Sequence, residues 1–373
     1  MAPVTTTTIA MVAQLPSFDR WAALHGKSYA SKAEWHHRRI IFEGTAAGVA
    51  AANSAQQKGG KGGFQQGMTW HGLDRTEEEL KRLRGYNAPV ALPSLAEAAS
   101  FTTTMGLGEL FDATSDGRGA RSVADLPASF DWRAHGAVSE VKEQGQGSSC
   151  WSFSSAGAVE GAVAIARSPN GTTGNAVSVS NQQIMDCSKI DCLDAINGTM
   201  TKAFANVIGW GGTLDSFKDY PYRDWECVTW DARCNPSMID PRCKFWCPPH
   251  VCQTNHTAVA KISKFVHTSI GNETDLLLAV SRGPVAVAMD ASQSNFMAYT
   301  GGVYSNAACQ SDKADLDHAV LAVGWGVDAS SGEEYWLVKN SWGTTWGMDG
   351  YFHLKRNSNN MCGIATDASM PFV

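Results

Sequence analysis

Several features are missing from the sequence, and each absence narrows what the protein can be. No run of 18 apolar residues occurs, so a membrane-spanning helix is not expected. The net charge of −6 argues against nucleic acid as a partner. Residues 1–15, MAPVTTTTIAMVAQL, lack the basic end and the apolar stretch of a secretory signal peptide. Two explanations of that start stay open: a trimmed chain, or a true start further upstream.

The sequence does contain a globular composition, with 43% hydrophobic and 18% charged residues, and its 373 residues suffice for two or three domains. Ten cysteines suggest an oxidising compartment. The N-x-[ST] sequons give weak support for such a compartment, because a chain of this length contains about this number by chance. They begin at Asn170, Asn197, Asn255 and Asn272.

The order of local patterns predicts an α+β protein. A charged, helix-rich segment is expected over 1–92, followed by a small-residue, Gly-containing stretch over 93–125 that is typical of a linker open to proteolysis. Residues 150–166 show helical periodicity. Short alternating strands dominate from 258 onward, so 126–373 is expected to fold as two lobes.

Residues 223–256 are rich in cysteine, proline and tryptophan, and they favour a loop stapled by disulfides. Zinc binding is the alternative, although the spacing matches no standard site; its ligands would be Cys247, His250, Cys252 and His256. We therefore expect neither a metal nor another cofactor.

The stretch QGQGSSCWSF, residues 144–153, places one cysteine after glycines and serines. A structural cysteine needs no glycine approach, whereas a nucleophile needs close access for a substrate backbone. Cys150 would stand at or near the first turn of the 150–166 helix, where the helix amino end and a nearby imidazolium lower a thiol pKa.

Three further residues complete this chemistry. His318 in DLDHAVLAVGWG is the expected acid and base, and Asn340 in KNSWGTTWG would orient its ring through an amide oxygen. Gln144 and the Cys150 backbone N–H would donate to developing negative charge on the substrate carbonyl. Each residue alone has an ordinary structural explanation, but their combination is far more specific.

The front segment carries a second pattern, spaced 4, 4, 3, 4 and 4 along one helix face: Glu34, Arg38, Phe42, Thr45, Val49 and Asn53. It resembles the propeptide signature of cathepsin L-like cysteine proteases at four of six positions. Asp74, in a stretch only loosely like a second propeptide element of that family, is also retained.

From about Phe18 to its end, the chain resembles a papain-family cysteine protease precursor of the cathepsin L-like branch. His318 and Asn340 follow Cys150 by 168 and 190 residues, further than the usual 130–150 residues, and the cysteine-rich stretch can absorb the surplus. The resemblance implies a helical lobe and a β-barrel-like lobe flanking a cleft, preceded by a helical propeptide. It implies a mature start near Leu126 and bridges Cys187–Cys243 and Cys309–Cys362. The connectivity of the other cysteines stays open: Cys192, Cys227, Cys234, Cys247 and Cys252.

The resemblance also suggests binding roles. Gly198 would hydrogen-bond the substrate residue two before the scissile bond, Trp342 would shield the Asn–His pair, and Trp346 would line the leaving-group side. The walls of the S2 pocket would be Met200, Ala288, Leu316 and Ala319, with Asp367 at its floor. Such a carboxylate should admit Arg or Lys besides Leu and Phe; the alternative is that Asp367 turns to solvent. A glycan on Asn197 would obstruct this pocket, so that sequon is expected to be unoccupied.

The expected function is a cysteine endopeptidase, made as an inactive precursor, that cleaves polypeptides through an acyl-enzyme. Expected partners are polypeptide substrates, the propeptide as intramolecular inhibitor, and cystatin-like inhibitors; a monomer in a lysosome or vacuole, or secreted, is expected. Two alternatives stay open: a catalytically idle peptide-binding homologue, and an exopeptidase or ligase of the same family. The missing cysteine at Gly147 leaves the loop before Cys150 less tethered than is usual in the family.

Overall fold

The computed structural model describes residues 16–59, 63–69, 72–86, 122–168, 175–188, 198–223, 252 and 257–373. The predicted linker at 93–125 lies mostly outside these residues, and the segment boundaries stay predictions. Among the described helices, none is both long and apolar enough to cross a membrane. No cluster of three metal-ligating side chains occurs in the described part of the chain.

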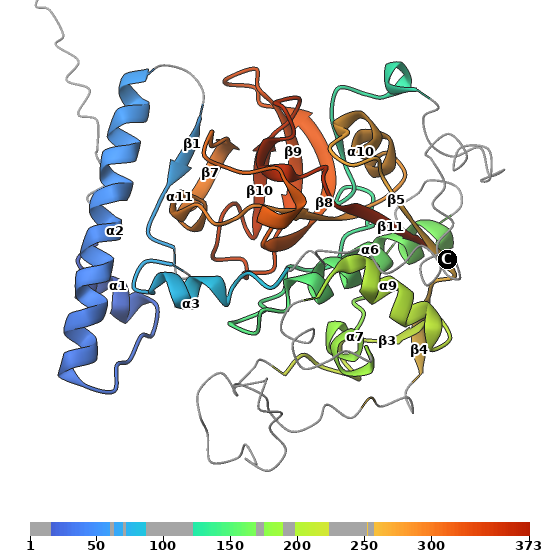
Figure 1. The fold of residues 1–373 in the computed structure, drawn as a ribbon, viewed down its shortest axis with the longest axis horizontal. Coiled ribbons are helices and arrows are strands. Elements are labelled where there is room, and N and C mark those ends of the chain that lie inside the picture. The colour runs from blue at the N-terminus through green and yellow to red at the C-terminus, as the bar shows by residue number, and fades with distance from the viewer. Residues whose placement is uncertain are drawn as a thin grey trace, which may run out of the picture.

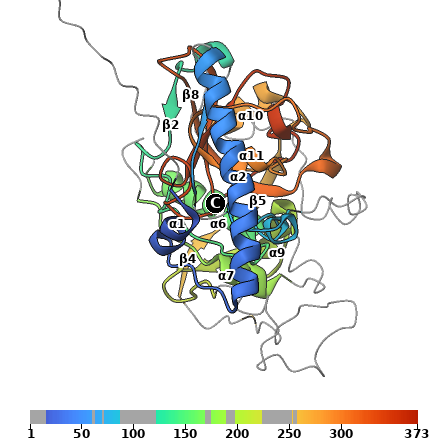
Figure 2. The same cartoon turned by 90° about the vertical axis from the view of Figure 1, so that its left-hand side faces the viewer.

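The front segment consists of α1 (Phe18–Leu24), α2 (Lys32–Gly59), β1 (Phe64–Gln66) and α3 (Glu77–Lys81). Helix α2 runs along one side of the molecule, next to β1 (Figures 1 and 2). Its apolar face encloses a small core with α1, because Phe42 packs on Phe18 and Trp21. Thr76 caps α3 through a reciprocal hydrogen-bond pair with Glu79, which satisfies amides that the helix start leaves open.

The patterned face of α2 ties the front segment together. Arg38 makes an ion pair with Glu79 and also donates to the Asp74 carbonyl at 3.0 Å. Asn53 pairs with both backbone groups of Gln66 in β1, at 2.7 and 3.1 Å. The spacing therefore correctly predicted one functional helix face, and that face orders the chain leading to residues 82–86.

The helical part of the main body contains α6 (Cys150–Arg167), α7 (Asn181–Cys187) and α9 (Met200–Gly209). A two-stranded sheet of β3 (Thr213–Asp215) and β4 (Ala258–Lys261) accompanies them. Helix α6 is apolar on nearly every side and lies centrally, between the other helices and the large sheet (Figure 1). Its amino end, which carries Cys150, is thereby held where the two parts meet.

The large sheet has nine strands in the order β1-β7-β10-β9-β8-β6-β11-β5, with β2 paired to β8. The bounds are β2 (Phe130–Asp131), β5 (Lys264–His267), β6 (Val285–Met289), β7 (Tyr299–Tyr304), β8 (His318–Val327), β9 (Glu334–Lys339), β10 (Tyr351–Lys355) and β11 (Ala368–Phe372). Among the strand pairs that the described residues form, β7–β10 alone is parallel. Strand β1 of the front segment thus extends the sheet of the main body at β7.

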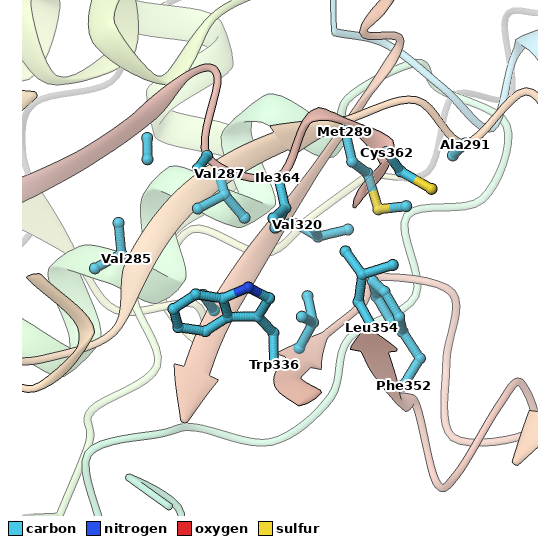
Figure 3. Close-up of a cluster of buried hydrophobic side chains, with 14 of the residues drawn as sticks. Val285, Val287, Met289, Ala291, Val320, Trp336, Phe352, Leu354, Cys362 and Ile364 are labelled. Carbon is cyan, nitrogen blue, oxygen red and sulfur yellow. The ribbon is translucent and has the colours of Figure 1, made fainter. Parts of the chain in front are cut away.

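Short helices complete the sheet region: α10 (Glu273–Val280), α11 (Ser294–Met297), η1 (Val123–Asp125), η4 (Lys313–Asp315) and η5 (Met361–Gly363). Inward-facing side chains of the strands form a dry core in which Val287, Val320, Trp336 and Phe352 meet (Figure 3). Helices in one part and a sheet in the other confirm the predicted α+β class.

One predicted disulfide is confirmed and one is wrong. Cys309 and Cys362 are bonded as expected. Cys187 is bonded to Cys252 and not to Cys243, which lies outside the described residues. The reason is that Gln183 of α7 holds Asp215 of β3, and Asp215 pairs with Ala258 at the start of β4. The chain entering β4 therefore reaches the end of α7. A zinc site using Cys252 is excluded by the same bond, since zinc needs a free thiolate.

Candidate active site

Cys150 is the first residue of α6 and the free cysteine among the described residues. Its side chain is fully buried. The sulfur accepts hydrogen bonds from the backbone N–H of Ala319 at 3.3 Å and from that of Gly85 at 3.1 Å. Because Ala319 directly follows His318, the sulfur lies beside the backbone that carries the predicted imidazole, at the junction of helix and sheet.

His318 and Asn340 meet because β8 and β9 are antiparallel neighbours, with Leu321 opposite Lys339. The His318 Nε2 atom lies 2.9 Å from the Asn340 Oδ1 atom. The Trp342 ring stacks on the imidazole at a centroid distance of 4.7 Å and covers this pair. The other ring nitrogen, His318 Nδ1, has no hydrogen-bond partner among the described residues. It is the imidazole atom left available for a proton exchange.

Gln144 has a fixed amide orientation. Its Oε1 atom accepts from the Ser341 hydroxyl, which leaves the Nε2 group as a donor. That group donates to the Leu83 carbonyl at 3.0 Å, and the Trp342 indole N–H donates to the same oxygen at 3.3 Å. The two donors converge on one carbonyl oxygen, which is the geometry expected for stabilising an oxyanion.

Residues 82–86 of the front segment fill the site. The Arg82 carbonyl accepts from the Ser148 N–H at 2.9 Å and from the Ser148 hydroxyl at 3.2 Å. Gly85 passes so close that a Cβ atom there would lie 1.7 Å from the Ser148 carbonyl oxygen. Only glycine can therefore occupy this position while its amide contacts the Cys150 sulfur.

Tyr86 enters the pocket predicted as S2. It forms a parallel bridge with Gly198 and belongs to the same buried cluster as the predicted walls; these are Met200, Ala288, Leu316 and Ala319. Its hydroxyl donates to Asp367, and Lys313 Nζ lies 3.0 Å from the same carboxylate oxygen. Asp367 is buried, so the alternative in which it turns to solvent is wrong.

Trp346 lies behind Trp342, with ring centroids 5.0 Å apart, and its indole N–H donates to the Met297 carbonyl at 3.1 Å. Thr69 of the front segment donates to that same carbonyl at 2.8 Å. The front segment thus covers this side as well. Whether Trp346 contacts a leaving group stays a prediction.

Burial controls the protonation of the reactive pair. Desolvation raises the pKa of the Cys150 thiol to about 12, against the lowering effect of its backbone hydrogen bonds. Desolvation likewise lowers the pKa of His318 to about 3, against the raising effect of its bond to Asn340. With residues 82–86 in place, burial thus favours the neutral forms of both groups over the thiolate–imidazolium pair.

Sequence reasoning missed several residues of the site. Gly85, Tyr86 and Lys313 carry no local motif, and only the path of the chain brings them here. Ser148 could have been found from the sequence, because it replaces the glycine of the family pattern Cys-Gly-Ser-Cys-Trp. It adopts a positive φ of 50°, a conformation that favours glycine. Arg84 is a further surprise, because it bridges Glu77 and Asp317, the residue before His318.

Comparison with known proteins decides the family. Residues 126–372 match the papain family cysteine protease model, and residues 18–80 match the cathepsin propeptide inhibitor domain. The chain belongs to the papain family of cysteine proteases. It is a cathepsin L-like cysteine endopeptidase made as a precursor with an inhibitory propeptide, and it acts on polypeptides.

Its relatives include cathepsin L of Sarcophaga peregrina, 37% identical over 352 residues that cover 94% of this chain and 90% of that protein. Cysteine proteinase 3 of Dictyostelium discoideum is 44% identical over 246 residues, covering 66% of this chain and 64% of that protein. The solved structure of digestive procathepsin L2 proteinase from the larval midgut of Tenebrio molitor is 34% identical. It superposes with a TM-score of 0.74 and covers 95% of this protease and 98% of that chain. The papain-like fold with a helical propeptide is thereby confirmed.

Proposed function

We propose that Cys150 is the nucleophile of this protease, His318 its acid and base, Asn340 the residue that orients the imidazole, and Gln144 an oxyanion donor. The observation that carries this assignment is the contact of the Cys150 sulfur with the amide of Ala319, beside a His318 ring held by Asn340 at 2.9 Å. Once residues 82–86 leave, water enters and the thiolate–imidazolium pair can form.

In the proposed reaction the thiolate attacks the carbonyl carbon of a peptide bond. The Gln144 amide and the Cys150 backbone N–H stabilise the resulting oxyanion. His318 gives its proton to the leaving amine, and the C–N bond breaks to leave a thioester on Cys150. His318 then takes a proton from water as the water attacks the thioester. The C–S bond breaks to release the carboxylic acid and the Cys150 thiolate, which restores the thiolate–imidazolium pair.

The specificity of the protease depends on the pocket that Asp367 closes. We propose that it is mainly hydrophobic, since its walls are Met200, Ala288, Leu316 and Ala319, and that Asp367 allows Arg or Lys to enter. Gly198 would pair with the substrate backbone beside it. Comparable cleavage of peptides with Arg and with Ala at the second residue before the scissile bond, at a pH where Asp is ionised, would contradict this role for Asp367.

For the compartment, we propose a lysosome, a vacuole or secretion. The relatives named as cathepsin L and as a digestive midgut enzyme support this proposal.

Asn272 is the one sequon inside the described residues, and it is exposed. Its Oδ1 atom caps α10 by accepting from the backbone N–H groups of Thr274 and Asp275. Its amide nitrogen can still carry a glycan. The other three sequons, Asn197 included, lie outside the described residues. A monomer that is open to cystatin-like inhibitors is also proposed.

The decisive experiment incubates the precursor at about pH 4–5 and follows its mass and the cleavage of a long peptide together. We expect loss of the front segment and the appearance of endopeptidase products. Labelling by an epoxide electrophile should appear at the same time and should be absent in Cys150→Ala. An unlabelled, inactive protein would favour the idle homologue, and stepwise removal of terminal residues would favour an exopeptidase.

A further inference from the structure

The pocket closed by Asp367 already holds a side chain of this protein. Tyr86 is only 4% exposed, and its hydroxyl donates to the Asp367 Oδ2 atom. The buried ring belongs to the same hydrophobic cluster as Met200, Leu316 and Ala319, so the pocket accommodates a whole phenol. Since a pocket recognises a side chain whichever way the backbone runs past it, Tyr86 is a guide to the substrate side chain that fits.

The carboxylate at the floor already has a cation. Lys313 Nζ lies 3.0 Å from the oxygen that Tyr86 contacts, and the Lys313 side chain is 31% exposed, at the rim of the pocket. His267 also faces Asp367, and burial lowers the pKa of that histidine, which favours its neutral form. Asp367 and Lys313 therefore form a pair of zero net charge, with the carboxylate free to accept one more hydrogen bond.

Three kinds of substrate side chain would interact differently with the Asp367–Lys313 pair. A phenol donates a hydrogen bond and brings no charge. A phenylalanine ring fills the same space but leaves the buried carboxylate without that donor, which is costly. A guanidinium or ammonium group meets Asp367 but also meets Lys313, and two like charges in one pocket repel each other.

We propose that the Asp367–Lys313 pair makes this protease select substrates with tyrosine at the residue that enters the pocket, two before the scissile bond. Lys313 is then a specificity-determining residue, because it removes the preference for cations that Asp367 alone would create. This inference rests on the proposed function, and it narrows the proposed acceptance of Arg or Lys: we expect these residues to be cleaved, but more slowly than tyrosine.

The test uses the acid-activated full precursor and peptides that differ only at this residue, with Tyr, Phe or Arg. At about pH 6, kcat/KM for the Tyr peptide should exceed that for the Phe peptide by about fivefold or more, and the Arg peptide should be slower than the Tyr peptide. Equal or faster cleavage of the Phe peptide, or fastest cleavage of the Arg peptide, would overturn the proposal. This comparison needs no variant.

Two variants then separate the partners. Lys313→Met should raise the Arg to Tyr ratio of kcat/KM by about tenfold, and Asp367→Ala should abolish the Tyr over Phe preference. Lys264→Met is the matched control and should leave all ratios unchanged. Lys264, in β5, lies over the ring of Phe372 in β11. An unchanged Arg to Tyr ratio in a folded, active Lys313→Met variant would exclude the role of Lys313. Failure of the proposed function looks different, since no peptide would be cleaved and Cys150 would not be labelled.

Discussion

The backbone amide of Gly85 donates to the sulfur of Cys150 at 3.1 Å. The thiol attacks the carbonyl carbon of a peptide bond, so it cannot react with the N–H group that contacts it here. The front segment therefore blocks the nucleophile with backbone, in a place where only glycine fits.

Gly85→Ala should destroy this block. The added Cβ atom would lie 1.7 Å from the Ser148 carbonyl oxygen, so residues 82–86 must move away at a cost of about 1–3 kcal/mol or more. We expect epoxide labelling of Cys150 in the unprocessed precursor at neutral pH, about tenfold or more faster than in the wild type. Gly44→Ala is the control, because nothing lies within 4 Å of a Cβ atom there. Equal labelling rates in the two variants would contradict the prediction.

His318 should make the closed precursor less stable in acid. Its pKa is lowered to about 3 by burial, against 6.5 when it is exposed, so below pH 6.5 the opened chain binds a proton that the closed chain does not. Stability is then lost as pH falls from 6.5 towards 3, by up to about 1.4 kcal/mol per pH unit. Asp317, with its pKa raised to about 6 by burial, acts in the opposite direction.

A matched pair isolates the histidine. Cys150→Ala prevents processing, and adding His318→Asn to it removes the titrating ring. The unfolding midpoint of the single variant should fall more steeply between pH 6.5 and 4 than that of the double variant. Parallel curves would show that burial of His318 does not drive the acid sensitivity.

Ser148 should reveal two opposing effects. Its φ of 50° costs about 1 kcal/mol for a non-glycine residue, while its hydroxyl adds a hydrogen bond to the Arg82 carbonyl. In the Cys150→Ala precursor, Ser148→Ala keeps the strain and loses the bond, so it should be less stable by about 1 kcal/mol. Ser148→Gly loses both and should stay within about 0.5 kcal/mol of the parent. Denaturant unfolding measures this, and an alanine variant as stable as the glycine variant would contradict the account.

Gln144→Ala should act on the transition state. The Gln144 amide donates to the carbonyl oxygen in the site, and removing one such donor lowers kcat by about 10²–10³ with little change in KM. Steady-state kinetics of the activated enzyme on one peptide check this. Gln310→Ala, at an exposed position, is the control. A loss confined to KM would assign Gln144 to ground-state binding.

Much of the site could be predicted from the sequence because its signals are local. The serines and the apolar periodicity place Cys150 at a helix start, and Cys150 is indeed the first residue of α6. The spacing of Arg38, Phe42 and Asn53 predicts one helix face, and each of these residues makes contacts from it. These predictions succeeded because a helix converts sequence spacing directly into position.

The predictions that failed concerned contacts between distant parts of the chain. The partner of Cys187 was wrong because strand β4 pairs with β3 beside α7, and no local pattern records that pairing. The occupancy of the Asp367 pocket by Tyr86 was missed for the same reason, since 281 residues separate the two in the chain.

The sequence by itself determined which chemical groups the site of this protease contains. They are a thiol at a helix start, an imidazole, a carboxamide and a carboxylate for a pocket. Only the tertiary structure decided their state. Packing of residues 82–86 over the thiol excludes water, and this desolvation favours the neutral forms of Cys150 and His318. Desolvation depends on everything that surrounds a group, and it is therefore invisible to any local pattern in the chain.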